Sequence, residues 1–91
     1  MAKKDVIKGT TTQGFEYEIP MSNFDYEYME LIAEIDEKPY LMAKLIRTTL
    51  GDDLNEKLKD FCRKEDGTIP LEDVEAIFNE IILGNTKTKN S

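Results

Sequence analysis

The chain of 91 residues contains no histidine, no tryptophan and one cysteine, Cys62. A single cysteine cannot form an intrachain disulfide, which excludes a small secreted fold held together by disulfide bridges. Long apolar runs are also absent, so we expect neither a signal peptide nor a membrane span. These absences predict a protein of a reducing compartment, the cytoplasm.

The same absences bear on catalysis, because histidine is the commonest general base and a common metal ligand. Neither a metal-ligand cluster nor a phosphate-binding loop is present in the sequence. Adjacent carboxylates such as Asp36 and Glu37 point about 100 degrees apart on a helix, so they do not converge on one substrate atom. We therefore expect no catalytic residues, no metal and no cofactor.

Basic residues are scarce, with 12 Lys and Arg against 19 Asp and Glu, which gives a net charge of −7. Several lysines lie at the two ends, so residues 9–84 hold 7 basic and 18 acidic side chains, hence −11. Such a surface repels phosphate backbones, so we do not expect a nucleic-acid partner. A basic surface, or an apolar partner reached through a gap in the charge, fits better.

The N-terminal part predicts a β-hairpin. Apolar and acidic residues alternate strictly from Phe15 to Ile19, which is the period of a strand with one buried face. An earlier β-prone segment begins at Val6, and Gly14 lies between the two at a turn. Because an isolated hairpin is barely stable in water, we expect it to pack against the rest of the chain.

Four apolar stripes at helical spacing follow. The first starts at Phe24 after a cap at Ser22 or Asn23, and the second begins at Pro39 and stops at Gly51. The third opens at Asp52 or Asp53, and the last runs from Pro70 to Leu83. The predicted fold is mainly α, a small bundle of about four helices preceded by an N-terminal β-hairpin.

The predicted domain organisation has three parts. Residues 1–13 form an N-terminal arm with the first hairpin strand, and residues 14–84 form a single helical domain that ends at Gly84. Residues 85–91 contain only Asn, Thr, Lys and Ser, which predicts a disordered polar tail.

The segment from Glu65 to Val74 resembles the second half of an EF-hand, with Gly67 and Ile69 at the glycine and apolar positions of its loop. In that register two ligand positions fall on Cys62 and Lys64, which are a thiol and an ammonium. We therefore interpret the segment as a plain connection between helices, and Cys62 as a small buried apolar residue.

The apolar residues exceed what a bundle this small can bury, since each helix hides only one face. Surplus apolar surface usually marks a site for a partner or for self-association into a homo-oligomer. The candidate partner-binding residues are Tyr26, Met29, Tyr40, Met42, Phe78 and Ile82. We expect them to bind an amphipathic helix, although packing under the hairpin is an alternative for some of them.

A family resemblance rests on the order of several segments. These are the strand 14–19, the helical segment 28–36, the helix from Pro39 to Gly51, and the turn 64–71 that leads into a last helix. In this order they resemble the tail assembly chaperones of phages and prophages of Gram-positive bacteria with long non-contractile tails. The resemblance covers about residues 14–83.

The resemblance implies a non-enzymatic helical protein that coats the tape measure protein in the host bacterial cytoplasm while subunits of the major tail protein assemble around it. It also implies that the chaperone is absent from the mature virion. The alternative is a small acidic interaction module of another origin, such as a metal-free EF-hand-like protein or an anti-repressor. An anti-repressor that mimics nucleic acid would gather its acidic side chains on one face.

Overall fold

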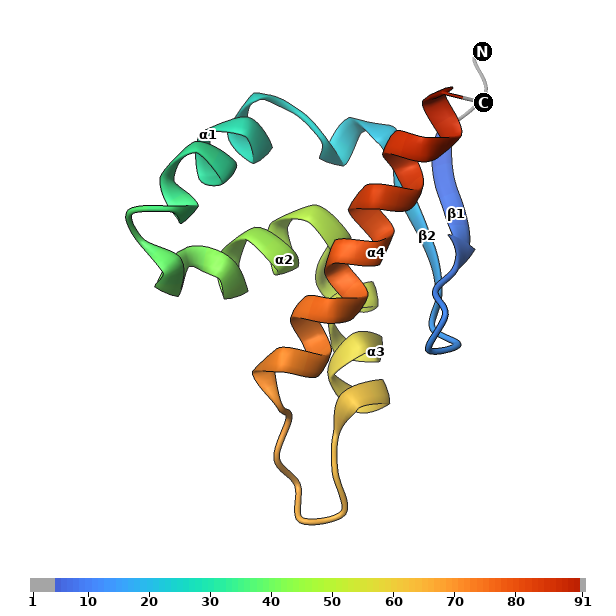
Figure 1. Cartoon of the computed structure of the whole chain (residues 1–91), viewed down its shortest axis with the longest axis vertical. Helices are drawn as coiled ribbons and strands as arrows, with labels where there is room; N and C mark the ends of the chain where they lie inside the picture. The colour runs from blue at the N-terminus through green and yellow to red at the C-terminus, as the bar shows by residue number, and fades with distance from the viewer. Residues whose placement is uncertain (1–4, 91) are drawn as a thin grey trace.

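The computed structural model describes the backbone of residues 5–90 and the side chains of residues 5–84. A two-stranded hairpin precedes four α-helices, which confirms the predicted mainly helical bundle with an N-terminal β-hairpin. The elements in chain order, with η denoting a short 3-10 helix, are β1 (Val6–Thr10), β2 (Glu16–Pro20), η1 (Met21–Asn23), α1 (Tyr26–Ile35), η2 (Pro39–Leu41), α2 (Met42–Leu50), α3 (Asp52–Cys62) and α4 (Leu71–Asn90). Helix α4 lies between the hairpin and the α1–α2 pair (Figure 1).

The hairpin packs one face onto the helices, as its alternating sequence predicts. Strands β1 and β2 are antiparallel, with Ile7 opposite Ile19 and Gly9 opposite Tyr17. Phe15 and Ile19 are buried in the core, and Tyr17 packs against it. Because successive side chains of a strand face opposite sides, the intervening Glu16 and Glu18 remain exposed.

Two connections in the chain use the same turn. In the hairpin, the Gly14 amide donates to the Thr11 carbonyl and the Thr11 amide to the Phe15 carbonyl, both at 2.9 Å. Between α3 and α4, the amides of Gly67 and Lys64 donate to the carbonyls of Lys64 and Thr68 in the same pattern. Gly14 and Gly67 have φ values of 98° and 93°, which glycine adopts without a steric penalty.

The start of α1 differs from the sequence prediction. Its N-cap is Asp25, whose Oδ1 accepts a hydrogen bond from the Tyr28 amide at 3.1 Å. Asn23 lies in η1, and its side-chain amide donates instead to the Thr49 carbonyl of α2 at 2.8 Å. The predicted cap at Ser22 or Asn23 is therefore wrong, because a contact with α2 occupies the Asn23 side chain.

Helix α4 also differs, because its backbone continues past Gly84 to Asn90. The predicted helix end at Gly84 is therefore wrong. The predicted disorder of residues 85–91 stays a prediction, and Ser91 lies outside the described residues. A Cβ atom at Gly84 would lie 3.4 Å from the Tyr17 hydroxyl, and one at Gly9 only 2.9 Å from it. Gly84 thus allows close packing between α4 and the hairpin and does not end the helix.

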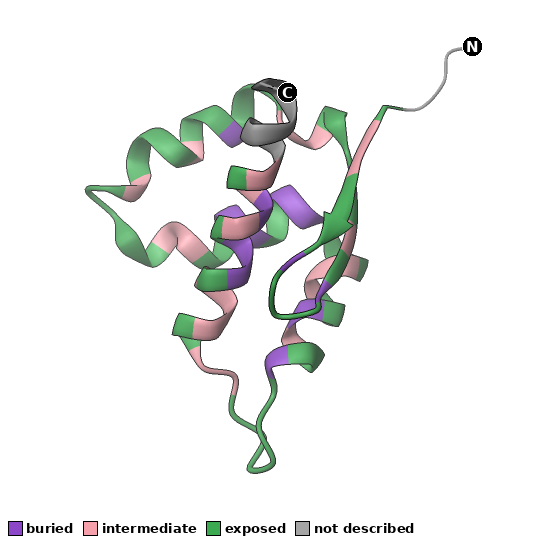
Figure 2. Ribbon diagram, turned by 45° about the vertical axis from the view of Figure 1, so that its right-hand side comes forward, coloured by how far each residue is buried: buried purple, intermediate pink, exposed green. Residues whose placement is uncertain are grey.

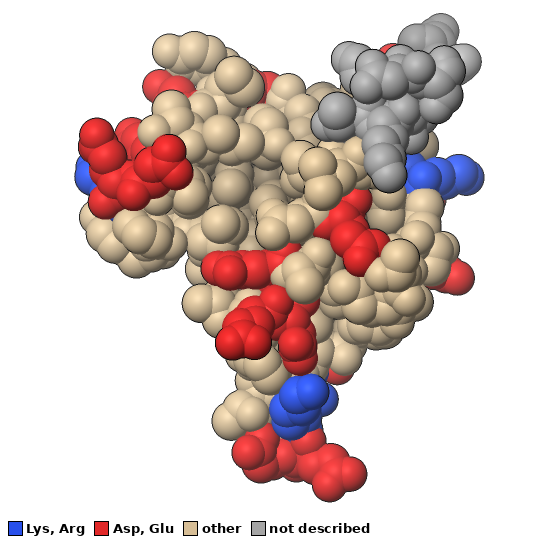
Figure 3. Space-filling view, viewed as in Figure 1, with Lys and Arg blue, Asp and Glu red and all other residues tan. Residues whose placement is uncertain are grey.

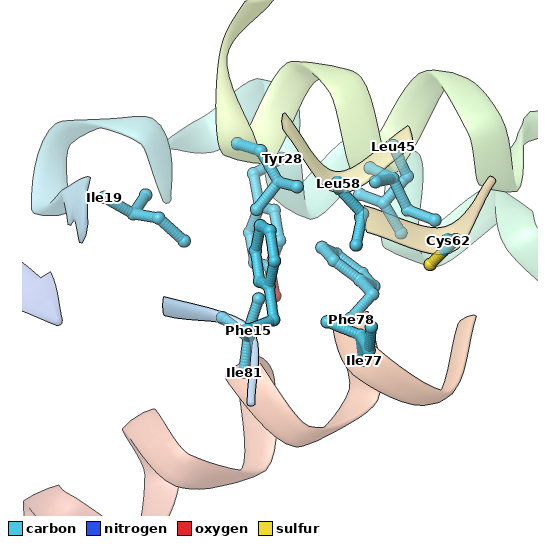
Figure 4. Packing of buried hydrophobic residues seen from close by; sticks show 11 residues of the cluster. Phe15, Ile19, Tyr28, Leu45, Leu58, Cys62, Ile77, Phe78 and Ile81 are labelled. Carbon is cyan, nitrogen blue, oxygen red and sulfur yellow. The ribbon is translucent and has the colours of Figure 1, made fainter. Parts of the chain in front are cut away.

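The core lies where α4 meets α2, α3 and the inner face of the hairpin (Figure 2). Ile77, Phe78 and Ile81 of α4 are buried, and Figure 4 shows the Phe78 ring pointing toward Leu58 of α3. The remaining buried apolar residues are Phe15, Ile19, Tyr28, Leu45, Ile46, Leu50 and Cys62. Within residues 5–90, none of the helices combines the length and the apolarity that a membrane span requires.

Candidate partner-binding groove

The predicted partner-binding residues fall into three groups by exposure. Tyr26, Met29 and Tyr40 are 75%, 60% and 76% exposed, as the surplus of apolar residues predicts. Met42 and Ile82 are partly buried and pack against the core. Phe78 is only 3% exposed, so its assignment to surplus surface is wrong: its ring completes the core against α3.

Three of these residues nevertheless meet in one apolar groove between α1 and α4. Met42 and Leu45 of α2 line it together with Phe78, Asn79, Ile82 and Leu83 of α4. The opposite wall consists of Tyr28, Ile32 and Ile35 of α1 and the C-cap residue Asp36. This α1–α4 groove has a volume of about 480 Å³ and opens to solvent.

The groove exists because α1 and α4 do not pack closely on each other. Helix α1 makes its main contacts with α2 and η2, whereas α4 packs chiefly on α3. The helical spacing of Tyr28, Ile32 and Ile35 predicts one buried stripe, yet Ile32 is 42% exposed. Leu83 on the α4 wall is 60% exposed, so apolar side chains from both walls reach solvent.

The apolar surface of α1 extends beyond the groove. Met29 lies one turn before Ile32, and Tyr26 one turn before Met29, which places neighbours on adjoining parts of the helix surface. Tyr40 belongs to η2 and is not part of the groove lining. Of the predicted residues, the structure therefore brings together Met42, Phe78 and Ile82, extends the surface along α1 with Met29 and Tyr26, and leaves Tyr40 apart.

The candidate partner-binding residues predicted from the sequence did not include Ile32 and Leu83, although both line the groove and are exposed. Ile32 fits the main stripe of its helix, and Leu83 merely broadens the stripe of α4. The sequence did contain a signal that Ile32 is exposed. Met29 lies outside the main apolar stripe of its helix, and Ile32 follows it by one turn, so the apolar surface widens toward solvent at this point.

Charge surrounds the groove but hardly enters it. Among the residues with described side chains, Asp36 is the only charged one in its lining. Figure 3 shows acidic side chains over the end of α1 and along α4, with uncharged surface between them. Burial raises the pKa of the Tyr28 hydroxyl, so Tyr28 enters the wall as a neutral side chain. Such a surface suits an apolar ligand better than an ionic one.

A larger hollow of about 770 Å³ lies between the hairpin and the α2–α3 junction. Its lining mixes ammonium groups of Lys8 and Lys57 with the carboxylates of Glu16 and Asp52 on an open surface. In the described part of the chain, no buried side-chain nitrogen or oxygen lacks a hydrogen-bond partner. This hollow therefore has no buried polar group that points to a ligand.

The segment that resembles part of an EF-hand is a turn closed by its own side chains. Asp66 Oδ1 accepts hydrogen bonds from the Thr68 amide at 3.0 Å and the Thr68 hydroxyl at 2.7 Å. These hydrogen bonds lower the pKa of Asp66. Among the described residues, no group of three or more His, Cys, Asp or Glu side chains is placed to hold a metal ion.

Cys62 is buried at the end of α3, as predicted. Burial raises the pKa of its thiol, and the negative charge of Asp73 raises it further, while Lys64 opposes the effect. A thiol with a raised pKa holds its proton at neutral pH and is a poor nucleophile. Cys62 therefore fills space in the core.

No protein-family model, curated protein or solved structure matches this chain.

Proposed function

We propose that the chain is a non-enzymatic tail assembly chaperone of a phage or prophage with a long non-contractile tail. It binds apolar helical segments of the tape measure protein in the bacterial cytoplasm until subunits of the major tail protein displace it. The observation that carries this proposal is the apolar α1–α4 groove, whose exposed residue Ile32 lies one helical turn from the exposed Met29.

The groove has the features of a site for an amphipathic helix. Such helices bind by placing apolar residues at helical spacing into an apolar groove between other helices. Ile32 and Leu83 contribute exposed apolar surface from the two walls, and Met42 contributes a flexible thioether to the floor. Methionine adapts to varied side chains, which suits a chaperone that covers many segments of a long partner.

The acidic body supports the same role, because mutual repulsion keeps protein complexes of high net charge dispersed. A nucleic-acid mimic would instead present its carboxylates as one continuous face. On the face drawn in Figure 3, acidic groups are separated by uncharged surface over α1 and α4. This distribution favours docking of an apolar segment over mimicry of nucleic acid.

Co-expression with the tape measure protein of the same phage tests the proposal. We expect the chain to increase the soluble fraction of the tape measure protein and to co-purify with it. Replacing Ile32 and Leu83 with serine should weaken both effects, since both side chains are exposed in the groove and their loss leaves the core intact. Failure of the intact chain to co-purify or to change solubility would refute the proposal.

Met21→Ser provides the matched control. Met21 is 45% exposed, similar to Ile32, but lies in η1 and does not line the α1–α4 groove. We expect this variant to retain the tape measure protein as well as the unaltered chain does. Equal loss with Met21→Ser and with the groove variants would mean that general surface apolarity, and not the groove, accounts for binding.

A further inference from the structure

We propose that the α1–α4 groove is selective for a basic amphipathic helix, whose apolar stripe enters the groove while its Lys or Arg residues face acidic side chains of α1 and α4. The inference rests on the proposed function and deepens it, because it names the chemistry of the segment that the partner presents.

Acidic side chains flank the α1–α4 groove. Asp36 closes it at the C-terminal end of α1. On α4, Glu75 lies one turn before Phe78 and Asn79, and this spacing places it on the groove side of that helix. A carboxylate therefore stands beside the apolar lining on each wall.

Among residues 5–84, no unpaired cation lies beside the groove. Lys38 follows Asp36 by two residues, but its Nζ lies 4.0 Å from Glu34 Oε1. Helix α1 contains no Lys or Arg between Tyr26 and Ile35, and the part of α4 with described side chains, Leu71 to Gly84, contains none either. The basic residues of α2 are Lys44 and Arg47, each two positions from a groove residue. A separation of two turns a side chain away from its neighbour on a helix, so these cations face elsewhere.

A basic helix fits the charges of the groove better than a second copy of this chain does. A second copy of this chain carries the same net charge of −7 and would bring acidic helices against acidic walls. Like charges placed opposite each other at an interface oppose association, whereas opposite charges favour it and select the partner. A helix with Lys or Arg beside its apolar stripe satisfies both the apolar lining and the carboxylates.

Two synthetic peptides test the inference against the intact chain. Both have the same leucine stripe at helical spacing, and they differ only in whether lysine or glutamate flanks it. We expect the lysine peptide to bind more tightly by about tenfold or more at low ionic strength, with the difference shrinking as salt screens the charges. Equal affinity for the two peptides would overturn the inference.

Variants locate the effect. Asp36→Asn and Glu75→Gln should each weaken binding of the lysine peptide by about twofold to fivefold, the range expected for one partly exposed ion pair. Glu30→Gln is the matched control, because Glu30 stands two positions from Tyr28 and from Ile32 and so faces away from the groove. Equal loss in all three variants would mean diffuse attraction and would overturn the inference.

Four further outcomes test this inference or separate it from the proposed function. Glu75→Lys should gain affinity for the glutamate peptide, which a merely structural role of Glu75 would not produce. If the tape measure protein co-purifies but the two peptides bind alike, the basic helix is wrong and the chaperone proposal stands. If the lysine peptide binds in the groove but the tape measure protein does not, the chaperone proposal fails.

Self-association that Ile32→Ser abolishes would identify a second copy of this chain as the occupant of the groove and overturn the inference.

Discussion

Glu80 of α4 holds the hairpin turn through two hydrogen bonds from a single residue, Thr12. The Thr12 amide donates to Glu80 Oε1 at 2.9 Å, and the Thr12 hydroxyl donates to Oε2 at 2.6 Å. These two bonds join residues far apart in the sequence and fix the tip of the hairpin against the middle of the last helix.

The Thr12–Glu80 contact predicts a loss of stability in acid. The two hydrogen bonds lower the pKa of Glu80 below its usual value of 4.5. A lowered pKa in the folded state contributes stability that is present above pH 4.5 and is lost as the pH falls through the folded pKa. Urea unfolding at a series of pH values should show that Glu80→Gln has lost part of this acid dependence, whereas Glu72→Gln keeps it. An identical pH profile for both variants would contradict the prediction.

Gly51 should resist replacement. It connects α2 directly to α3 with φ 88° and ψ 161°, a region of backbone space that only glycine occupies readily. No atom lies within 4 Å of a Cβ placed there, so the effect of Gly51→Ala is one of backbone conformation and not of crowding. We expect a destabilisation of about 1–3 kcal/mol in urea unfolding. The control is Thr48→Ala at an exposed position of α2, which should change the free energy of unfolding by no more than about 0.5 kcal/mol. An unchanged urea midpoint for Gly51→Ala would contradict the backbone conformation described for Gly51.

The core predicts large effects at two fully buried positions. Leu58 of α3 and Ile81 of α4 are both 0% exposed. Truncating either to alanine removes apolar contacts and leaves a cavity, at a cost of about 2–5 kcal/mol in the free energy of unfolding. Leu71→Ala is the control, because Leu71 is 60% exposed and should cost no more than about 0.5 kcal/mol. Similar losses of stability at all three positions would show that α4 does not pack on the core with the face described here.

Cys62 should react slowly with thiol reagents in the folded protein. Its thiol is buried and has a raised pKa, so both access and thiolate formation are limited. Alkylation by iodoacetamide, followed by mass spectrometry, should accelerate strongly when urea unfolds the chain. The unfolded chain provides the reference rate. Labelling of the native protein at that rate would show that Cys62 is accessible to solvent at the end of α3.

Local patterns in the sequence were sufficient to predict the elements themselves. Alternation from Phe15 to Ile19 predicts a strand, because successive side chains of a strand face opposite sides. Helical spacing predicts four helices, and Gly51 marks the stop of the second as expected. The predicted start at Pro39 is wrong for the α-helix, because Pro39 begins the 3-10 helix η2 and α2 begins at Met42. The burial of Cys62 was also predictable, since it follows the apolar residues of α3.

Contacts between distant segments were not predictable in the same way. Asn23 has the chemistry of a helix cap, but the Thr49 carbonyl of α2 accepts its side-chain hydrogen bond. Gly84 has the chemistry of a helix stop, yet it lies within the helix where the Tyr17 hydroxyl approaches α4. In each case a partner far away in the sequence decided between two locally acceptable roles.

The sequence by itself determined that this chain forms a hairpin and four amphipathic helices with more apolar residues than one small core can bury. Only the tertiary structure decided which of those residues stay outside. Phe78 became core and Ile32 reached solvent because α1 packs on α2 while α4 packs on α3, which leaves an apolar groove between α1 and α4. The physical reason is that periodicity specifies which face of a helix is apolar, whereas the packing of neighbouring helices specifies how much of that face is covered.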